Sequence, residues 1–141
     1  MKRILLVEDD DADAMLAERA ISRVLQPTGM VYEVIRARDG IVACDKLFDG
    51  EKLRQSFDLV LLDLHLPRMS GIDCLKVIRA NHSGWKLPVV IMTTSNTQTD
   101  IEKAYLNRTN GYVEKPLRPV DFNQVIQKTF SFWLDLNQVP Q

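Results

Sequence analysis

The sequence predicts an α/β protein built on a parallel sheet. Five short apolar runs recur along the chain, at residues 4–7, 31–35, 59–62, 89–92 and 112–113. A stretch with helical spacing of apolar residues follows each run, and repeated strand–helix units give a parallel sheet. Two of the runs end directly in acid, which is typical of strands that end at a ligand-binding edge. We therefore expect one sheet with a functional site at its carboxyl edge.

The first three helices are predicted from apolar residues spaced three and four positions apart. The first follows the first strand, and Pro27 and Gly29 stop its pattern. The second begins near Gly40, and the third begins after Gly71 and fades at residues 81–84. Both carry a single apolar stripe, which indicates helices that lie with one face on the sheet.

The last two helices differ in how much apolar surface they offer. Residues 97–106 carry a thin apolar stripe, so this helix is expected to be the least firmly held. The final helix starts at Pro119, which suits a first helical turn, and its apolar positions continue to Trp133. Phe130, Phe132 and Trp133 spread around more than one face of that helix, so its own sheet is not expected to cover all three.

Composition limits the classes of protein to consider. The chain has 141 residues, 45% of them hydrophobic and 26% charged, which suits a single globular domain and leaves no length for an output domain. The formal net charge of -1, without a run of Lys or Arg, argues against nucleic acid and anionic membranes as partners. Cys44 and Cys74 lie outside any metal-ligand spacing, and no leader or membrane-length apolar segment is seen, so we expect a cytoplasmic protein with reduced thiols.

Asp63 is the candidate nucleophile. It follows the apolar run at 59–62, and a carboxylate at a strand end can attack a phosphoryl group and hold it as an aspartyl phosphate. An acid that only caps a helix or closes a turn is the structural alternative, and Asp63 taken alone does not separate the two. The turn residues 64–67 and Gly71 keep Asp63 at the rim and favour the nucleophile.

Glu8 and Asp9 are the candidate metal ligands. Like charges a few ångströms apart resist joint ionisation unless a cation accepts their oxygens, and Mg²⁺ takes one or two protein carboxylates together with waters and phosphate oxygens. Asp10, Asp11 and Asp13 instead fit the first turn of a helix, where the macrodipole favours negative charge. We therefore leave these three acids outside the predicted site.

Thr93 and Lys115 follow the fourth and fifth runs, so a parallel sheet brings both to the same edge as Asp63. A fixed ammonium, a hydroxyl and a metal are the usual means of stabilising charge on a transferred phosphoryl group. Taken singly, Lys115 would be explained as a solvated surface amine and Thr93 as a strand-end hydroxyl with its own hydrogen-bond partner. Because these residues and the acids all follow predicted strands of one sheet, we favour one shared site. Tyr112 fits either a core aromatic or a rim aromatic with two rotamers, and the sequence leaves this open.

These residues together resemble the receiver domains of two-component response regulators. The shared motifs are Val-Glu-Asp-Asp at 7–10, Leu-Asp-Leu-His-Leu-Pro at 62–67 with Gly71, Thr-Thr at 93–94 and Lys-Pro at 115–116, and the likeness spans nearly the whole chain. The resemblance implies a flavodoxin-like (CheY-like), doubly wound, five-stranded sheet of order 2-1-3-4-5 with five helices. It also implies a stand-alone regulator that takes a phosphoryl group from a sensor histidine kinase and switches its partner-binding surface, without enzymatic activity beyond its own phosphotransfer and slow dephosphorylation.

The resemblance assigns a role to each candidate residue. It implies that Asp63 is the phosphoacceptor and that Lys115 is the phosphate partner. It implies that Mg²⁺ is held by the acids Glu8, Asp9 and Asp63 together with the backbone carbonyl of His65. Thr93 and Tyr112 match the switch pair of the family. Two residues depart from the family pattern: Thr94 stands where many receivers have Ala, and His65 stands two residues after the acceptor. These departures bear on the lifetime of the phosphoryl group.

Within the family, the chain resembles the small regulators paired with cyanobacterial phytochrome kinases. The likeness rests on the long stretch between Phe48 and Phe57, the hydroxyl-rich run at 93–95 and the tail at 132–134. A homodimer through the fourth helix, the fifth strand and the last helix is expected, because the tail aromatics need cover and two-fold self-association is common. The alternative is a monomer whose tail folds back over the domain.

Two other functions stay open from the sequence. An aspartate-based phosphatase of the haloacid dehalogenase type would use the same nucleophile, but it requires a second Asp where this chain has His65. A receiver that is never phosphorylated and serves as a scaffold is excluded by no single residue. The intact set of acids, Thr and Lys argues against the scaffold.

Overall fold

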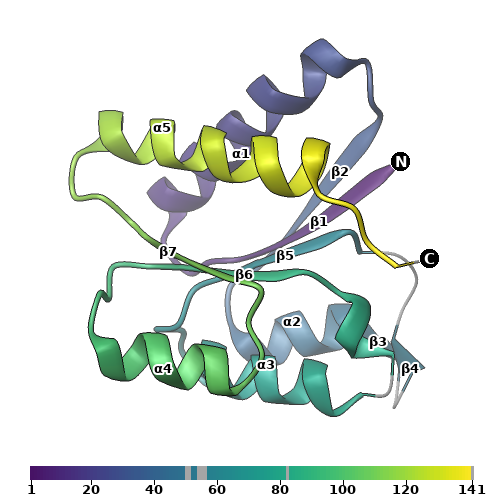
Figure 1. The fold of residues 1–141 in the computed structure, drawn as a ribbon, viewed down its shortest axis with the longest axis vertical. Coiled ribbons are helices and arrows are strands. Elements are labelled where there is room, and N and C mark those ends of the chain that lie inside the picture. The colour runs from purple at the N-terminus through teal and green to yellow at the C-terminus, as the bar shows by residue number, and fades with distance from the viewer. Residues whose placement is uncertain (50–51, 54–56, 82, 141) are drawn as a thin grey trace.

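Five parallel strands form the central sheet of the computed structural model, which describes residues 1–49, 52–53, 57–81 and 83–140 (Figure 1). The strands are β1 (Lys2–Val7), β2 (Tyr32–Ala37), β5 (Leu59–Leu62), β6 (Val89–Thr93) and β7 (Gly111–Glu114). They lie in the order β2-β1-β5-β6-β7, and neighbouring strands pair in parallel. Counted among these five strands, this is the order 2-1-3-4-5, so the fold implied by the resemblance is confirmed.

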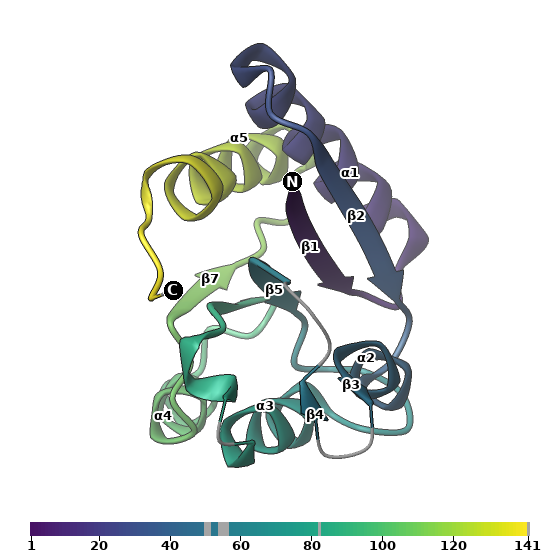
Figure 2. The same ribbon diagram turned by 90° about the vertical axis from the view of Figure 1, so that its right-hand side faces the viewer.

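The helices cover both faces of the sheet (Figures 1 and 2). On one face α1 (Asp11–Leu25) packs against α5 (Pro119–Phe130), and on the other face lie α2 (Gly40–Leu47), α3 (Gly71–Ala80) and α4 (Gln98–Leu106). Pro27 lies in a short 3₁₀ turn, Gln26–Thr28, that ends α1, and Gly29 follows it with φ of 72°. The predicted start positions at Gly40, Gly71 and Pro119 are confirmed.

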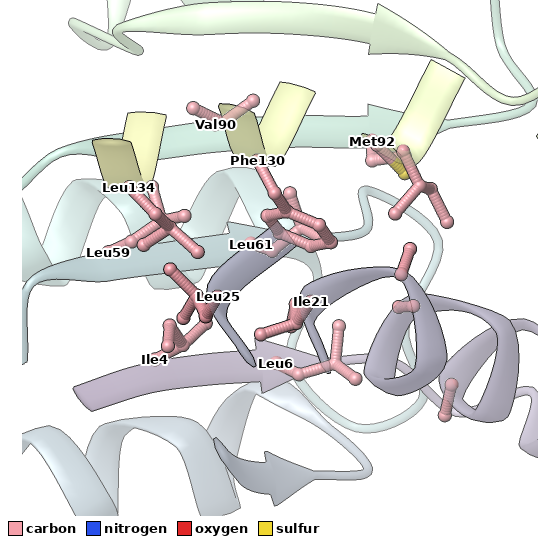
Figure 3. Close-up of a cluster of buried hydrophobic side chains, with 14 of the residues drawn as sticks. Ile4, Leu6, Ile21, Leu25, Leu59, Leu61, Val90, Met92, Phe130 and Leu134 are labelled. Carbon is pink, nitrogen blue, oxygen red and sulfur yellow. The ribbon is translucent and has the colours of Figure 1, made fainter. Parts of the chain in front are cut away.

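Each face of the sheet has its own hydrophobic core, because successive residues of a strand point to opposite faces. Ile4 and Leu6 of β1 pack among α1 and α5, where Phe130 fills the centre (Figure 3). Leu5 and Val7 of the same strand belong to the second core, under α2 and α3. A strand that is buried on both sides has no polar positions, which explains the continuous apolar runs in the sequence.

The chain after α5 continues as one π-helical segment, Ser131–Leu136, and covers part of its own domain. Phe130 is fully buried, and Trp133 packs against the same core beside Gly111. Phe132 is 47% exposed and meets Trp133 edge to face, with ring centroids 5.0 Å apart. The expectation that the sheet cannot cover all three tail aromatics is confirmed, but the uncovered ring is that of Phe132 alone.

The α4 helix is the one with the smallest buried face, as its thin stripe predicts. Ala104 is its one buried residue, whereas Tyr105 and Leu106 face solvent.

A small antiparallel hairpin, β3 (Phe48–Asp49) and β4 (Lys52–Leu53), was not predicted. It lies in the stretch up to Phe57 that carries part of the finer resemblance, and the rest of that stretch falls largely outside the described residues.

Two further features could not be seen in the sequence. Cys44 of α2 and Cys74 of α3 are free thiols, yet their sulfur atoms lie 3.9 Å apart. Arg79 is buried at the end of α3 and donates hydrogen bonds to the backbone oxygens of Gly84, Leu87 and Arg108 and to the Asn110 side chain. Across the described residues, no helix is both long enough and apolar enough to span a bilayer.

Candidate functional site

The acids Glu8, Asp9 and Asp63 meet at the carboxyl edge of the sheet. Val7 of β1 pairs with Leu62 of β5, so the residues that follow them emerge side by side. One carboxylate oxygen from each of the three acids lies within 4.8 Å of the other two. Glu8 and Asp63 are buried and Asp9 is exposed, so the cluster opens to solvent on one side. The predicted grouping of these acids is confirmed.

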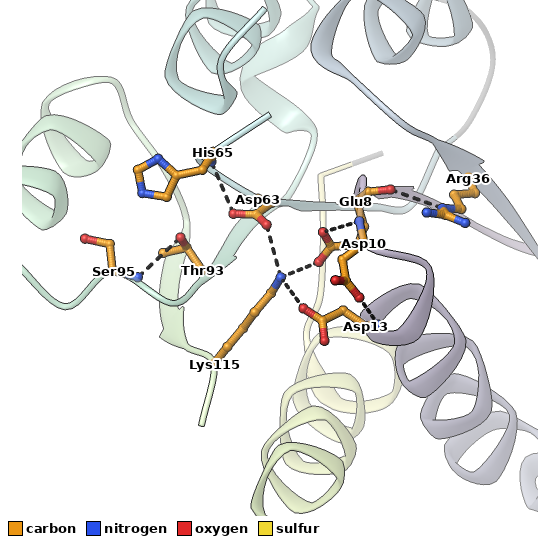
Figure 4. A network of polar contacts seen from close by, with 9 residues as sticks. All are labelled: Glu8, Asp10, Asp13, Arg36, Asp63, His65, Thr93, Ser95 and Lys115. Atoms are coloured by element: carbon orange, nitrogen blue, oxygen red, sulfur yellow. Dashed lines mark hydrogen bonds and ion pairs between the residues drawn. The ribbon is translucent and has the colours of Figure 1, made fainter. Parts of the chain in front are cut away.

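Lys115 reaches the same cluster from the end of β7. Its backbone N–H donates to the Thr93 carbonyl at 2.7 Å, which fixes the strand end beside β6. Its buried ammonium Nζ donates to Glu8 Oε1, to Asp63 Oδ2 at 3.0 Å and to Asp13 Oδ2 at 2.9 Å (Figure 4). The structure thus brings Lys115 to the predicted acids and adds Asp13, which the sequence analysis left outside the site.

The charges of this cluster are not balanced by one ammonium. Burial raises the pKa of Glu8 to about 7, because desolvation outweighs the hydrogen bond and attraction from Lys115, and the charge of Asp63 adds to the rise. Burial alone would lower the pKa of Lys115, but its hydrogen bonds to Glu8 and Asp13 and the charge of Asp63 raise it above its usual value. An all-oxygen cluster with excess negative charge fits a hard divalent cation such as Mg²⁺.

The loop after Asp63 depends on a close approach of α3. Gly71 N–H donates to the Leu64 carbonyl at 2.9 Å, and a Cβ on Gly71 would lie 2.1 Å from the Asp63 carbonyl oxygen. The side chain of Ser70 caps α3 by accepting from the Asp73 N–H. The His65 N–H donates to Asp63 Oδ1 at 3.2 Å, which orients the carboxylate. The assignment of the His65 carbonyl as a metal ligand stays a prediction.

Thr93 and Tyr112 are linked through Ser95, in the loop between β6 and α4. Thr93 is fully buried, and its Oγ1 accepts from the Ser95 N–H at 3.4 Å. The half-buried Tyr112 donates its hydroxyl to the Ser95 carbonyl at 2.9 Å, so it lies at the rim. Burial also raises the pKa of the Tyr112 hydroxyl, with smaller effects from nearby acids. Ser95 is a site residue that the sequence analysis missed, because only the path of the loop brings it between Thr93 and Tyr112.

The acids assigned to the first turn of α1 have three different roles. Asp10 is the N-cap and accepts from the Asp13 N–H at 2.8 Å, as expected. Asp11 pairs with Arg36 and Arg38, and these two guanidinium groups lower its pKa. Asp13 also lies in the first turn, but its carboxylate contacts Lys115, so its exclusion from the site was wrong. A sequence pattern gives no direction for this side chain.

The chain matches the response regulator receiver domain family over residues 4–127. The probable methanogenesis regulatory protein FilR2 of Methanothrix harundinacea is 38% identical over 97% of this chain and 86% of its own length. The response regulator Rcp1 of Synechocystis sp. is 35% identical over 99% of this chain and 93% of its own length. The phosphatase alternative finds no support in these matches.

Solved structures agree with the sequence matches. The phosphorylated cyanobacterial phytochrome response regulator RcpA superposes with a TM-score of 0.88 at 31% identity, over 99% of each chain. The Mn²⁺-bound form of Rcp1 superposes with a TM-score of 0.85 at 33% identity, over 100% of each chain. The chain therefore belongs to the response regulator receiver domain family and is homologous to stand-alone regulators of phosphorylation-based signalling.

Proposed function

We propose that this chain accepts a phosphoryl group from a sensor histidine kinase onto Asp63 in the cytoplasm. The observation that carries this proposal is the contact of Lys115 Nζ with Asp63 Oδ2 at 3.0 Å, beside the Glu8–Asp9–Asp63 cluster. An oxygen of Asp63 attacks the phosphorus, and the bond to the donor breaks with its electron pair on the leaving group. Lys115 donates to an outer phosphoryl oxygen and stabilises the charge that gathers there.

Glu8, Asp9 and Asp63 would hold Mg²⁺ during this transfer, with the His65 carbonyl as a further ligand. The acid cluster of this chain and the Mn²⁺-bound form of Rcp1 support that assignment. When bound there, Mg²⁺ would neutralise negative charge on the phosphoryl oxygens. Apart from this self-catalysed transfer and slow loss of the phosphoryl group, we propose no enzymatic activity.

Acetyl phosphate with Mg²⁺, followed by intact mass, tests the proposed acceptor. The wild-type protein should gain one phosphoryl group and the Asp63→Asn variant none. A gain at the wild-type rate in Asp63→Asn would show that another residue is the acceptor.

Asp9→Ala should weaken Mg²⁺ binding more than Asp10→Ala, since Asp10 caps α1 and lies outside the metal cluster. Equal losses in these two variants would contradict the metal assignment.

The switch that follows phosphorylation would act through Thr93 and Tyr112. At present the Thr93 Oγ1 accepts a long hydrogen bond, 3.4 Å, from the Ser95 N–H. A phosphoryl oxygen on Asp63 would give the Thr93 O–H a charged acceptor, and such charge-assisted hydrogen bonds are stronger than neutral ones. Movement of Thr93 disturbs the loop at Ser95, on which the Tyr112 hydroxyl rests. The partner-binding surface that changes is α4 with β7.

A phytochrome-type histidine kinase is the proposed phosphoryl donor. A second copy of this chain is the proposed partner on the surface formed by α4, β7 and α5. Similarity to Rcp1 and RcpA over nearly the full chain supports the kinase class. Phosphotransfer from a purified phytochrome kinase should be faster than from an unrelated histidine kinase under the same conditions. Equal or slower transfer from the phytochrome kinase would remove this pairing while leaving the acceptor assignment in place.

A further inference from the structure

The ammonium of Lys115 is surrounded by three carboxylates and has one N–H for each. The acceptors are Glu8 on the β1 end, Asp63 on the β5 end and Asp13 on α1 (Figure 4). Lysine has a long, flexible stem that loses considerable rotamer freedom when it is held in one place. Its fixed position therefore depends on these three contacts and on its burial.

Two of the three acceptors have other tasks when a phosphoryl group is transferred. Glu8 and Asp63 share the oxygen cluster with Asp9 that fits a divalent cation, whereas Asp13 is outside that cluster. Asp63 also becomes an acyl phosphate, so one of its oxygens is bonded to phosphorus. Asp13 is thus the acceptor that stays available to Lys115 throughout the reaction.

The local structure of α1 leaves the Asp13 side chain free for this contact. Asp13 is the third residue after the N-cap Asp10, the position from which a Glu or Gln side chain bonds back to the N–H of the cap in a capping box. Here the Asp10 N–H is already taken by Glu8 Oε2 at 3.2 Å. Asp13 therefore turns toward Lys115, and its backbone N–H is satisfied by Asp10 Oδ1.

We propose that Asp13 is a positioning residue that holds the Lys115 ammonium in place for phosphotransfer to Asp63. This inference rests on the proposed function of Asp63 as the acceptor. Without Asp13, the ammonium keeps only Glu8 and Asp63, whose oxygens would also serve the cation and the phosphoryl group. Lys115 then samples more positions, and fewer of them present an N–H to the outer phosphoryl oxygens.

The matched variants are Asp13→Asn and Asp11→Asn. Both remove one negative charge from the first turn of α1, but Asp11 pairs with Arg36 and Arg38 instead of Lys115. At saturating Mg²⁺, Asp13→Asn should slow phosphorylation by acetyl phosphate about tenfold, the order expected for losing one charge-assisted hydrogen bond in the transition state. Asp11→Asn should stay within about twofold of the wild type, and Asp13→Glu should recover part of the lost rate.

Two further measurements separate positioning from a general loss of structure. Mg²⁺ affinity measured by calorimetry should differ little between Asp13→Asn and wild type, because Asp13 is outside the metal cluster. Nitrogen-15 correlation spectra should show a sharp Lys115 ammonium signal in the wild type and a broadened one in Asp13→Asn, without metal or phosphoryl donor. This spectrum needs no phosphorylation, so it tests the contact even if Asp63 is not the acceptor.

Three results would overturn the proposal. They are an unchanged ammonium signal in Asp13→Asn, a phosphorylation rate equal to wild type in that variant, or the same slowing in Asp11→Asn. Failure of the proposed function looks different, because the wild type itself then gains no phosphoryl group on Asp63.

Discussion

Glu8 is the residue whose ionisation links stability to metal binding. Its pKa is raised from 4.5 to about 7 in the folded chain, because burial disfavours its charge. The folded state therefore keeps a proton that the unfolded state has lost, and the stability this gives is fully present below pH 4.5 and lost as the pH rises through about 7. Mg²⁺ requires the ionised carboxylate, so its binding should strengthen over the same range.

Thermal unfolding with and without Mg²⁺ checks this dependence. The rise in Tm caused by Mg²⁺ should be larger at about pH 8 than at about pH 5, since a ligand stabilises by the affinity it has for the folded state. Glu8→Gln removes the titrating group and should flatten most of the difference. An equal rise at both pH values in the wild type would contradict the assignment of Glu8 as a metal ligand.

Gly71 is required by packing, since its Cβ would lie 2.1 Å from the Asp63 carbonyl oxygen. Gly71→Ala should lower the free energy of unfolding by about 2 kcal/mol and slow phosphorylation, because the clash displaces the Asp63 loop. Gly29→Ala is the control: it is strained by its φ of 72° but meets no atom within 4 Å. We expect it to cost about 1 kcal/mol in urea denaturation and to leave the phosphorylation rate unchanged. Unchanged phosphorylation in Gly71→Ala would show that the loop tolerates the shift.

The site residues that could be predicted are those at the ends of strands. Glu8, Asp63 and Lys115 follow apolar runs, and a parallel sheet brings such ends together whatever the loops do. Asp13 and Ser95 could not be predicted, because their contacts depend on the direction of one side chain and the path of one loop. Helix acids and loop serines are common in any sequence, so neither residue carries a signal of its own.

At the scale of elements, α4 is the helix best placed to move. Ala104 is its one buried residue, and its N-terminal loop at Ser95 contacts both Thr93 and Tyr112. The thin apolar stripe in the sequence predicted this weak attachment. Arg79, which ties the end of α3 to the segments after it, could not be predicted, because a buried arginine that donates to backbone oxygens has no pattern in the sequence.

Amide exchange should therefore change most between residues 93 and 118 when a phosphate mimic binds Asp63. Beryllofluoride with Mg²⁺ supplies the mimic, and exchange is read by mass spectrometry in its presence and absence. The α2 helix, Gly40–Leu47, is the internal control because it takes no part in the hydrogen bonds that link Thr93, Ser95 and Tyr112. A uniform change along the chain, or a larger change in α2 than in α4, would contradict a local switch.

At the scale of the whole molecule, the two cores account for why the architecture was predictable. Strands buried on both faces must read as apolar runs, and amphipathic helices between them must cover both faces, so few arrangements fit. The strand order was predicted from the family resemblance, because hydrophobic periodicity does not show which strands lie next to each other in a sheet. The hairpin at β3 and β4 was missed because strands of two residues are too short to show a period.

Exposed apolar side chains on α4, before α5 and in the tail make the proposed homodimer testable. Leu106 of α4, Leu117 before α5 and Phe132 in the tail are 83%, 95% and 47% exposed. Trp133 is a poor probe of this face, because it packs on its own domain beside Gly111. Trp85 is a matched control, since it is 57% exposed but lies in the turn after α3, outside the elements of the proposed face.

Light scattering at micromolar concentration, with and without beryllofluoride, measures the mass of each variant. The wild type should approach the mass of two chains, and Phe132→Ser combined with Leu117→Ser should weaken association by about tenfold or more, because a few well-buried side chains carry most of an interface. Trp85→Ser should associate like the wild type, since its loss leaves the proposed face intact. A single-chain mass for the wild type under both conditions would remove the dimer, and equal weakening by Trp85→Ser would move the interface to another face.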